Sequence, residues 1–247
     1  MAQGRVRLPE VMRYLGYGGQ DVGRDLAARI EEVAALCDAE ARPRWVWRAF
    51  DLAPRPGRPA GGSGGLPVAG TALVLEGASA KRLLEGARSV ALLACTLGAD
   101  ADRRLRALGA TDPLGQLVYD AACSDLVEWA ADSAQAEVAA WARERGLFCG
   151  RRFSPGYGDL PLEVQPRLLD VLDAPRRLGL TATRDLLLVP TKSVTAVVGI
   201  YPQPPRPDAA PLGCGCCALR TACGFRERGL RCYRDGDLAP ARATNES

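Results

Sequence analysis

One long helical pattern, over residues 111 to 145, constrains the fold of this chain more than any other segment. Apolar residues recur in it at alternating intervals of four and three, so they line one face of an α-helix. Pro113 suits the first turn of this helix, and Thr111 is its expected N-cap. The residues of the apolar face are Val127, Ala131, Ala134, Val138 and Trp141. The sequence therefore predicts a long helix with one face available for packing.

The same helix carries three acidic residues, Asp125, Glu128 and Asp132. They lie three and four positions apart, so they share a face that differs from the apolar one. Taken on its own, this spacing is typical of a solvated acidic face.

Shorter elements are expected on both sides of the long helix. Helices are expected over residues 8–14, after an N-cap at Asp21, from Ala80, from near Asp100, and from Asp159 and Pro161. Strands are expected over residues 44–52, 71–76, 89–95, 186–189 and 193–200, the last two on either side of a Pro190–Lys192 turn. Loops are expected over residues 54–67, which are rich in Gly and Pro, and over residues 151–159.

The bulk composition is that of an ordinary globular protein, with 47% hydrophobic and 25% charged residues. A chain of 247 residues fits one large domain or two small ones and can bury a sizeable core, so its nine cysteines are not needed for folding. The net charge of +3 is too small to indicate nucleic acid or a membrane surface as a partner. No histidine occurs, which excludes a Ser-His-Asp triad, a His general base and a His-ligated zinc or haem.

The segment from Met1 to Arg7 lacks the apolar core of a signal peptide. No apolar run approaches the roughly 20 residues that a membrane span needs. We therefore expect a cytoplasmic protein. Thiols are usually reduced in that compartment, so clustered cysteines would indicate metal or redox chemistry rather than disulfides.

A hexapeptide, Arg152-Phe153-Ser154-Pro155-Gly156-Tyr157, follows the long helix. Pro155 and Gly156 favour a tight turn, and Gly156 permits a backbone conformation or a close ligand approach that a side chain would block. Arg152 offers a planar fork suited to a carboxylate, and Tyr157 offers an aromatic face and a hydroxyl. An amino-acid-like ligand with a flat base could use these groups together.

The hexapeptide resembles the Arg-x-(Ala/Ser)-Pro-Gly-Tyr motif of the activation (reactivation) domain of cobalamin-dependent methionine synthase. Other segments resemble that family, in its stand-alone form, in order and spacing, and the resemblance runs from about residue 5 to about residue 201. These segments are Glu10–Tyr17, Ala94–Gly98, Asp120–Glu128 and Pro190–Ala196. Gly16 is a departure, because by alignment it stands where the full-length enzymes carry an aspartate that contacts the ligand.

This resemblance implies an α/β fold with a twisted antiparallel sheet and flanking helices over residues 1–205. It also implies S-adenosylmethionine as the ligand. Arg152 would hold the ligand's carboxylate, Ser154 and Gly156 would contact it largely through the backbone, and Tyr157 would line the site. Glu128 matches the family's helix glutamate and would face the amino group or the sulfonium, where a carboxylate is favourable.

The resemblance further implies a role in reductive methylation of cob(II)alamin. The chain would present the methyl donor to cobalamin on a partner, a cobalamin-binding methionine synthase or a related corrinoid methyltransferase, with an electron from a flavodoxin-like or ferredoxin-like donor. Without histidine, the chain cannot supply a His ligand to cobalt. We therefore expect no catalytic residues and no catalysis by this chain alone.

Cysteines crowd the segment 206–234, which precedes a polar tail, residues 235–247, that we expect to be disordered. Four of them, Cys214, Cys217, Cys223 and Cys232, could ligate an iron–sulfur cluster or zinc through thiolates. Free thiols and a redox disulfide are the alternatives. The remaining cysteines outside this segment, Cys37, Cys95, Cys123 and Cys149, are expected to be small core residues.

Two other functions stay open at this point. One is an iron–sulfur or metal-binding electron-transfer protein for a corrinoid methyltransferase, in which the ligand site has been lost. The other is a structural subunit of a split methionine synthase that has no ligand of its own.

Overall fold

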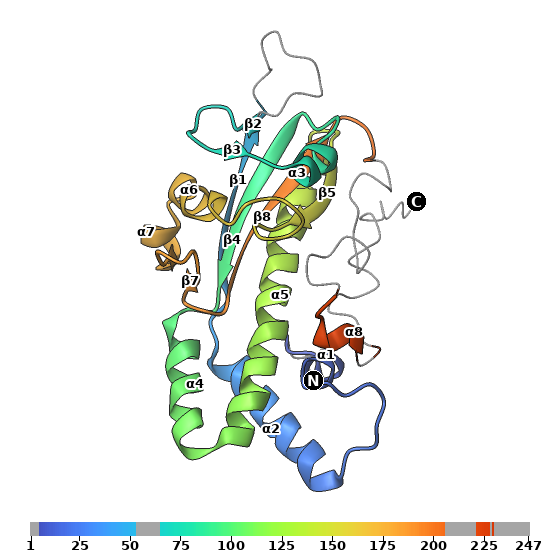
Figure 1. The fold of residues 1–247 in the computed structure, drawn as a ribbon, viewed down its shortest axis with the longest axis vertical. Coiled ribbons are helices and arrows are strands. Elements are labelled where there is room, and N and C mark those ends of the chain that lie inside the picture. Colours follow the sequence, from blue (N-terminus) through green and yellow to red (C-terminus); the bar gives the residue numbers. More distant parts are fainter. Residues whose placement is uncertain (1–4, 53–64, 206–220, 228, 230–247) are drawn as a thin grey trace. The chain divides into compact units, whose positions relative to one another are not determined.

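The computed structural model describes residues 5–52, 65–205, 221–227 and 229 (Figure 1). These residues form two compact units, which we call the helical unit and the sheet unit. The helical unit comprises the described residues of Met1–Val46, Ala94–Ala134 and Asp173–Val194. The sheet unit comprises those of Trp47–Leu93, Gln135–Leu172 and Thr195–Ser247. The long helix α5, Pro113–Arg143, contributes residues to both.

The helical unit contains most of the helices. Its elements are α1 (Leu8–Tyr14), α2 (Arg24–Glu40), α4 (Ala99–Thr111), the first part of α5, α7 (Ala174–Leu178), and the strands β6 (Thr181–Ala182) and β7 (Leu188–Val189). β7 pairs with β6 in an antiparallel hairpin, and the strand expected over residues 186–189 is limited to Leu188–Val189.

Two predicted helix caps are also wrong. α2 begins after Gly23, and Asp21 lies outside the helix. Thr111 is the last residue of α4, and its hydroxyl donates to the carbonyl of Ala107. The start of α5 is capped instead by Asp112, whose Oδ1 accepts from the N–H of Gly115 at 2.9 Å.

The core of the helical unit lies among α1, α2, α4 and α5. Val11, Ile30 and Leu126 are buried there with the thiols of Cys37 and Cys123, whose Sγ atoms are 3.6 Å apart. The hydrogen bond with Cys123 and burial both raise the pKa of the Cys37 thiol. The prediction that Cys37, Cys95 and Cys123 are core residues is confirmed, whereas Cys149 is half-buried.

The sheet has the strand order β1-β4-β8-β5. Its strands are β1 (Arg44–Asp51), β4 (Ser89–Thr96), β8 (Ser193–Tyr201) and β5 (Phe148–Phe153). β5 runs antiparallel to β8. The start of β4 is bonded to the end of β8 (Arg88 N to Ile200 O, 2.9 Å) and to the end of β1 (Leu52 N to Arg88 O, 3.2 Å), so these neighbours are antiparallel as well.

All eight residues of β4 are buried, which explains its continuous apolar sequence. In the sheet unit, Gln135 of α5 donates to Gly150 O of β5, and Thr195 of β8 donates to Gln165 of α6 (Val164–Val171), so helices flank the sheet. The expected α/β class with an antiparallel sheet and flanking helices is confirmed.

The remaining elements of the sheet unit are short. They are β2 (Leu66–Pro67), β3 (Val74–Leu75), α3 (Ala78–Leu83), α6 (Val164–Val171) and α8 (Gly224–Glu227). The strand expected over residues 71–76 is therefore limited to β3, and Pro67 belongs to a strand rather than to the loop before it. α6 begins at Val164 rather than at Asp159, and Pro166 falls in its first turn, where proline is tolerated.

Strand β5 was not expected from the sequence, which indicated a loop from residue 151. Its pairing with β8 contains a bulge, because Cys149 opposes Ile200 and Arg152 opposes Val198, which leaves Gly150 and Arg151 opposite a single residue. The strand is difficult to predict because Gly150 of β5 faces Gly199 of β8, and glycine is uncommon inside strands.

The two glycines make room for the ring of Tyr201. A Cβ on Gly199 would lie 2.6 Å from Tyr201 Cζ, and a Cβ on Gly150 would lie 2.8 Å from Tyr201 Cε2. The Tyr201 hydroxyl donates to the carbonyl of Leu83, and burial raises the pKa of Tyr201 to about 12. The bulge is thus held by a buried, hydrogen-bonded aromatic ring.

Replacing Gly199 by alanine is expected to destabilise the protein by about 2 kcal/mol, because the new methyl group overlaps the Tyr201 ring in a packed region. Chemical denaturation measures the effect. Gly224→Ala is the matched control, since nothing lies within 4 Å of a Cβ at that position. Equal stability of the two variants would contradict this account of the bulge.

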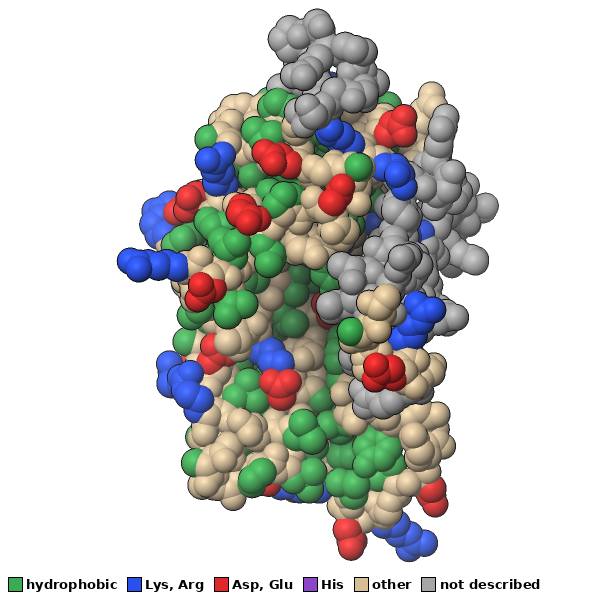
Figure 2. Space-filling view, viewed as in Figure 1, with side chains coloured by type: hydrophobic (Ala, Val, Ile, Leu, Met, Phe, Trp, Pro, Cys, Tyr) green, Lys and Arg blue, Asp and Glu red, His purple; other side chains and the backbone are tan. Residues whose placement is uncertain are grey.

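The surface in view in Figure 2 mixes acidic and basic side chains without a continuous patch of one sign. This distribution agrees with the small net charge of +3. Among the described residues, no helix has the length and apolar character that crossing a membrane requires.

Candidate functional site

The hexapeptide begins in the last two residues of β5, and its other four residues, Ser154–Tyr157, form a tight turn directly after the strand in the sheet unit. The N–H of Tyr157 donates to Ser154 O at 3.1 Å, and Gly156 has a φ of 88°, which suits a type II turn with proline before glycine. The Gly156 N–H donates to Leu160 O at 2.8 Å. Pro155 is buried while Gly156 and Tyr157 are exposed, the latter with 67% of its surface accessible. The predicted turn and the conformational role of Gly156 are confirmed.

Arg152 lies on β5 rather than in a loop, because the strand continues to Phe153. Its side chain is half-buried, and Nη1 donates to Gln135 Oε1 at 3.1 Å. Gln135 in turn donates from Nε2 to Gly150 O at 3.1 Å. The Gln135 amide therefore bridges Arg152 to the bulge and helps to hold the guanidinium in place.

The far end of the motif loop is attached to α3. The carboxylate of Asp159 accepts from the N–H groups of Ala78 at 2.6 Å and Ser79 at 2.8 Å. Gly77 allows this approach, since a Cβ there would lie 2.6 Å from Asp159 Oδ1. Partial burial opposes ionisation, but the hydrogen bonds from Ser79 and Ala78 outweigh it and lower the pKa of Asp159. Asp159, which was expected to begin a helix, instead anchors the loop.

Replacing Asp159 by asparagine is expected to destabilise the protein by about 1 kcal/mol at neutral pH, because the charged acceptor at these N–H groups is lost. The folded-state pKa is depressed, so the contribution of the carboxylate is present above the ordinary value of 3.8 and is lost as the pH falls through the lower folded value. Thermal unfolding of both proteins at about pH 7 and about pH 3 measures this. A difference that grows at acid pH would contradict the assignment.

Glu128 lies on α5 in the helical unit and is partly buried. Burial raises the pKa of Tyr14 on α1, and the charge of Glu128 raises it further, so these two side chains interact. Arg13 stacks on the Tyr14 ring at 4.4 Å and donates to Glu10 at 2.9 Å. The expected solvated acidic face is wrong, because Asp125 is buried and Glu128 is half-buried.

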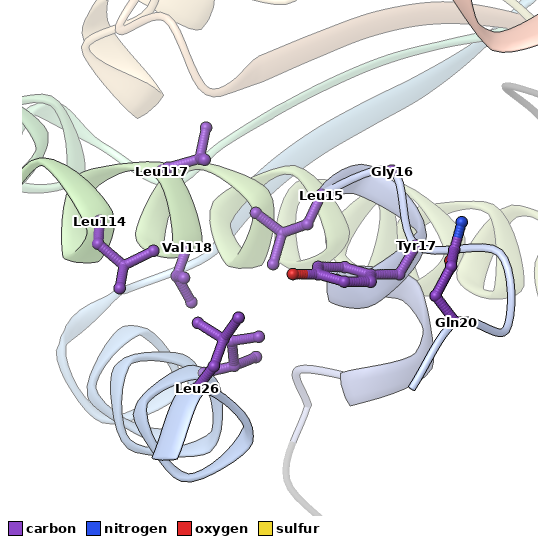
Figure 3. Close-up of a pocket in the computed structure, with 9 residues that line it drawn as sticks. Leu15, Gly16, Tyr17, Gln20, Leu26, Leu114, Leu117 and Val118 are labelled. Carbon is purple, nitrogen blue, oxygen red and sulfur yellow. The ribbon is translucent and has the colours of Figure 1, made fainter. Parts of the chain in front are cut away.

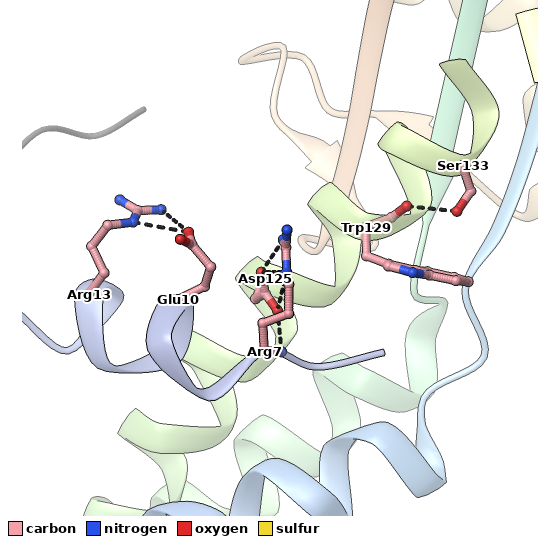
Figure 4. Close-up of polar contacts among 6 residues, drawn as sticks. All are labelled: Arg7, Glu10, Arg13, Asp125, Trp129 and Ser133. Carbon is pink, nitrogen blue, oxygen red and sulfur yellow. Dashed lines mark hydrogen bonds and ion pairs between the residues drawn. The ribbon is translucent and has the colours of Figure 1, made fainter. Parts of the chain in front are cut away.

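One turn before Glu128, Asp125 fixes the N-terminal segment to α5 (Figure 4). Its carboxylate accepts from the backbone N–H of Arg7 at 2.7 Å and from Arg7 Nε at 3.1 Å, and Arg7 Nη2 completes the ion pair. The Asp125 side chain is 1% exposed and that of Arg7 is 37% exposed. This pair holds α1, and with it Tyr14, beside Glu128.

The helical unit also contains an apolar pocket of about 290 Å³ (Figure 3). It is lined by Leu15, Gly16, Tyr17, Gln20, Leu26, Ile30, Leu114, Leu117 and Val118. Gly16 lines it, whereas none of the five residues predicted to bind the ligand does so. The hydroxyl end of Tyr17 points toward Leu26 and Val118 in Figure 3.

The structure thus groups Arg152, Ser154, Gly156 and Tyr157 in one strand end and turn of the sheet unit, and it places Glu128 in the helical unit. Ser154 is half-buried, and its carbonyl closes the turn. Gln135 was not predicted as a site residue, although it continues the three- and four-residue spacing of the acidic positions on α5.

The predicted cysteine cluster falls almost entirely outside the described residues. Cys214, Cys217 and Cys232 are not among them, and Cys223 is described as half-buried just before α8. Within the described part of the chain, no group of three or more Cys, Asp, Glu or His side chains is placed to hold a metal ion. The cluster therefore stays a prediction, as does the tail over residues 235–247.

Comparison with known proteins gives a match at the level of fold. No protein-family model and no curated protein matches the chain. Among solved structures, it is similar to the MetH reactivation domain bound to AdoHcy, with a TM-score of 0.61 and 16% sequence identity over 92% of this chain and 82% of that one. The chain therefore has the fold of a methionine synthase reactivation domain.

Proposed function

We propose that this chain binds S-adenosylmethionine and serves as a reactivation module or subunit of a cobalamin-dependent methionine synthase. One observation carries the proposal: the Arg152–Tyr157 motif ends in a tight turn that exposes Gly156 and Tyr157, in a chain with the fold of a reactivation domain. That structural neighbour is bound to AdoHcy, the demethylated form of the proposed ligand.

The residues of the turn fit the amino-acid and adenosine parts of this ligand. Arg152 is a half-buried cation that Gln135 helps to hold in place, and its planar fork suits a carboxylate. Gly156 offers backbone with no side chain at an exposed position, and Tyr157 offers an accessible aromatic face. Ser154 would contact the ligand through its backbone.

Glu128 supplies the complementary charge in the proposal. A carboxylate favours an ammonium or a sulfonium, both of which the ligand carries. The contacts with α1 restrict the side chain of Glu128, since Tyr14 lies next to it and the Arg7–Asp125 pair fixes α1 one turn away. Gly16 provides no charge at the position where the family that the chain resembles has an aspartate, so Glu128 is the acidic residue that the proposal assigns to the ligand.

The proposed contribution of this chain to the reaction is binding and orientation. Bound S-adenosylmethionine supplies the methyl group for the reductive methylation of cob(II)alamin on a partner, and a flavodoxin-like or ferredoxin-like protein supplies the electron. Residues 1–205 would form the module, and no residue of this chain is assigned to the corrin. The partner is a cobalamin-binding methionine synthase or a related corrinoid methyltransferase.

The experiment is reactivation of such a partner in its cobalt(II) state. Visible spectroscopy follows the cobalt while the chain, S-adenosylmethionine and a reductant are added. The proposal predicts recovery of methyl transfer only when all three are present. Recovery that is equally fast without the chain, or with Arg152→Ala, would contradict it.

A second candidate is favoured by the spacing of Cys214, Cys217, Cys223 and Cys232, which could hold an iron–sulfur cluster or zinc. A cluster would make the chain an electron-transfer protein for a corrinoid methyltransferase. Anaerobic purification followed by iron, sulfide and zinc analysis tests this candidate. Protein without visible absorbance and without bound metal would remove it.

A further inference from the structure

Two thiols from different helices meet in the core of the helical unit. Cys37 lies in the last turn of α2, and Cys123 lies in α5, 86 residues further along the chain. Their Sγ atoms are 3.6 Å apart, and both residues are 0% exposed. The buried cluster around them is largely apolar and includes Val33, Ala34 and Ala122. The two sulfur atoms are thus in contact with each other and shielded from water.

This arrangement needs little change to become a disulfide. The sulfur atoms of a disulfide are about 2.05 Å apart, so the two Sγ atoms would have to approach each other by about 1.5 Å. A bond between residues so far apart in the sequence would restrict the unfolded chain and thereby stabilise the folded one. It would also tie α2 to α5, which carries Glu128 just beyond Cys123.

We propose that Cys37 and Cys123 are a redox-sensitive pair that closes to a disulfide, with hydrogen peroxide as the oxidant. One Sγ attacks a peroxide oxygen, which gives a sulfenic acid and releases water. The second Sγ then attacks the sulfenic sulfur, which forms the S–S bond and releases a second water. The two thiols lose two protons and two electrons in total, and the peroxide is reduced to two waters. This inference does not depend on the function proposed above.

Burial has opposite effects on the two steps. It slows the first, because peroxide reaches the pair only when the helical unit opens locally, and because the raised pKa of Cys37 keeps its thiol protonated. It favours the second, because a sulfenic acid is polar and costs free energy in an apolar core, whereas a disulfide needs no hydrogen-bond partner. Two sulfur atoms held in contact also react at a high effective concentration. We therefore expect slow oxidation that ends in the disulfide.

The test maps the cross-link in the wild-type chain. Trypsin releases Cys37 within residues 30–44 and Cys123 within residues 107–143, and each of these peptides contains a single cysteine. The folded protein is incubated with hydrogen peroxide, and the remaining thiols are alkylated in denaturant before digestion and mass spectrometry. We expect the two peptides to be joined and to separate again after treatment with dithiothreitol. Two alkylated peptides without the joined species, or sulfinic acid at either cysteine in its place, would overturn the proposal.

Thermal unfolding gives an independent readout. Oxidation is expected to raise the melting temperature of the wild type by about 5 °C. Cys37→Ala and Cys123→Ala should lose this rise, since each lacks one of the two sulfur atoms. Cys95→Ala is the matched control, because Cys95 is equally buried but lies on β4, and this variant should keep the rise. A rise that persists in Cys37→Ala would contradict the pairing. Neither readout involves a ligand, so failure here leaves the proposed function standing.

Discussion

Replacing Arg152 by alanine is expected to weaken S-adenosylhomocysteine binding about 30-fold, which corresponds to about 2 kcal/mol. The reason is the loss of a charge-assisted contact with the carboxylate from a guanidinium that β5 and Gln135 hold in place. Isothermal titration calorimetry measures the change.

Two controls separate recognition from folding. Gln135→Leu should weaken binding less than Arg152→Ala does, because it removes the positioning amide and keeps the guanidinium. Arg143→Ala should bind like wild type, since this exposed arginine lies outside the turn. Wild-type affinity in Arg152→Ala would show that the motif does not hold the carboxylate.

Replacing Arg7 by alanine is expected to lower the free energy of unfolding by about 3 kcal/mol, because it leaves a buried carboxylate without its counter-charge. Asp125 is 1% exposed, and three groups of Arg7 donate to it. After the substitution only the backbone N–H at residue 7 remains. Urea denaturation followed by circular dichroism measures the loss.

The matched control is Arg103→Ala, which breaks a pair with Asp100 whose two side chains are 65% and 70% exposed. Such a pair contributes less than about 1 kcal/mol. The double variant Arg7→Ala with Asp125→Ala should be more stable than the sum of the single losses predicts, because the two groups interact directly. Equal, small losses for Arg7→Ala and Arg103→Ala would contradict the assigned role of the buried pair.

Regular elements with strong periodicity could be predicted from the sequence. α1 was expected at its observed limits, and α5 and the buried strand β4 were expected within two residues of theirs. In these elements the pattern of apolar residues in the sequence matches the residues that the fold buries. The turn at Pro155 and Gly156 could also be predicted, since proline fixes the φ that its turn position needs and glycine readily adopts the positive φ of the next one. In these cases the local preference and the tertiary environment agree.

The errors arose where a distant partner decides the structure. β5 contains two adjacent arginines and Gly150, and only its pairing with β8 and the ring of Tyr201 make it a strand. Asp125 looked solvated because its partner, Arg7, lies 118 residues away. Asp159 looked like a helix start, yet its carboxylate binds N–H groups that lie 80 and 81 residues away in the sequence. Such contacts leave no periodic signal in the sequence.

The most direct test of the central claim is a calorimetric titration of the wild-type chain with S-adenosylhomocysteine. The account predicts saturable binding of one ligand per chain, which Arg152→Ala weakens. The absence of saturable heat up to about 1 mM ligand would contradict this claim, because the binding free energy would then be less than about 4 kcal/mol in magnitude.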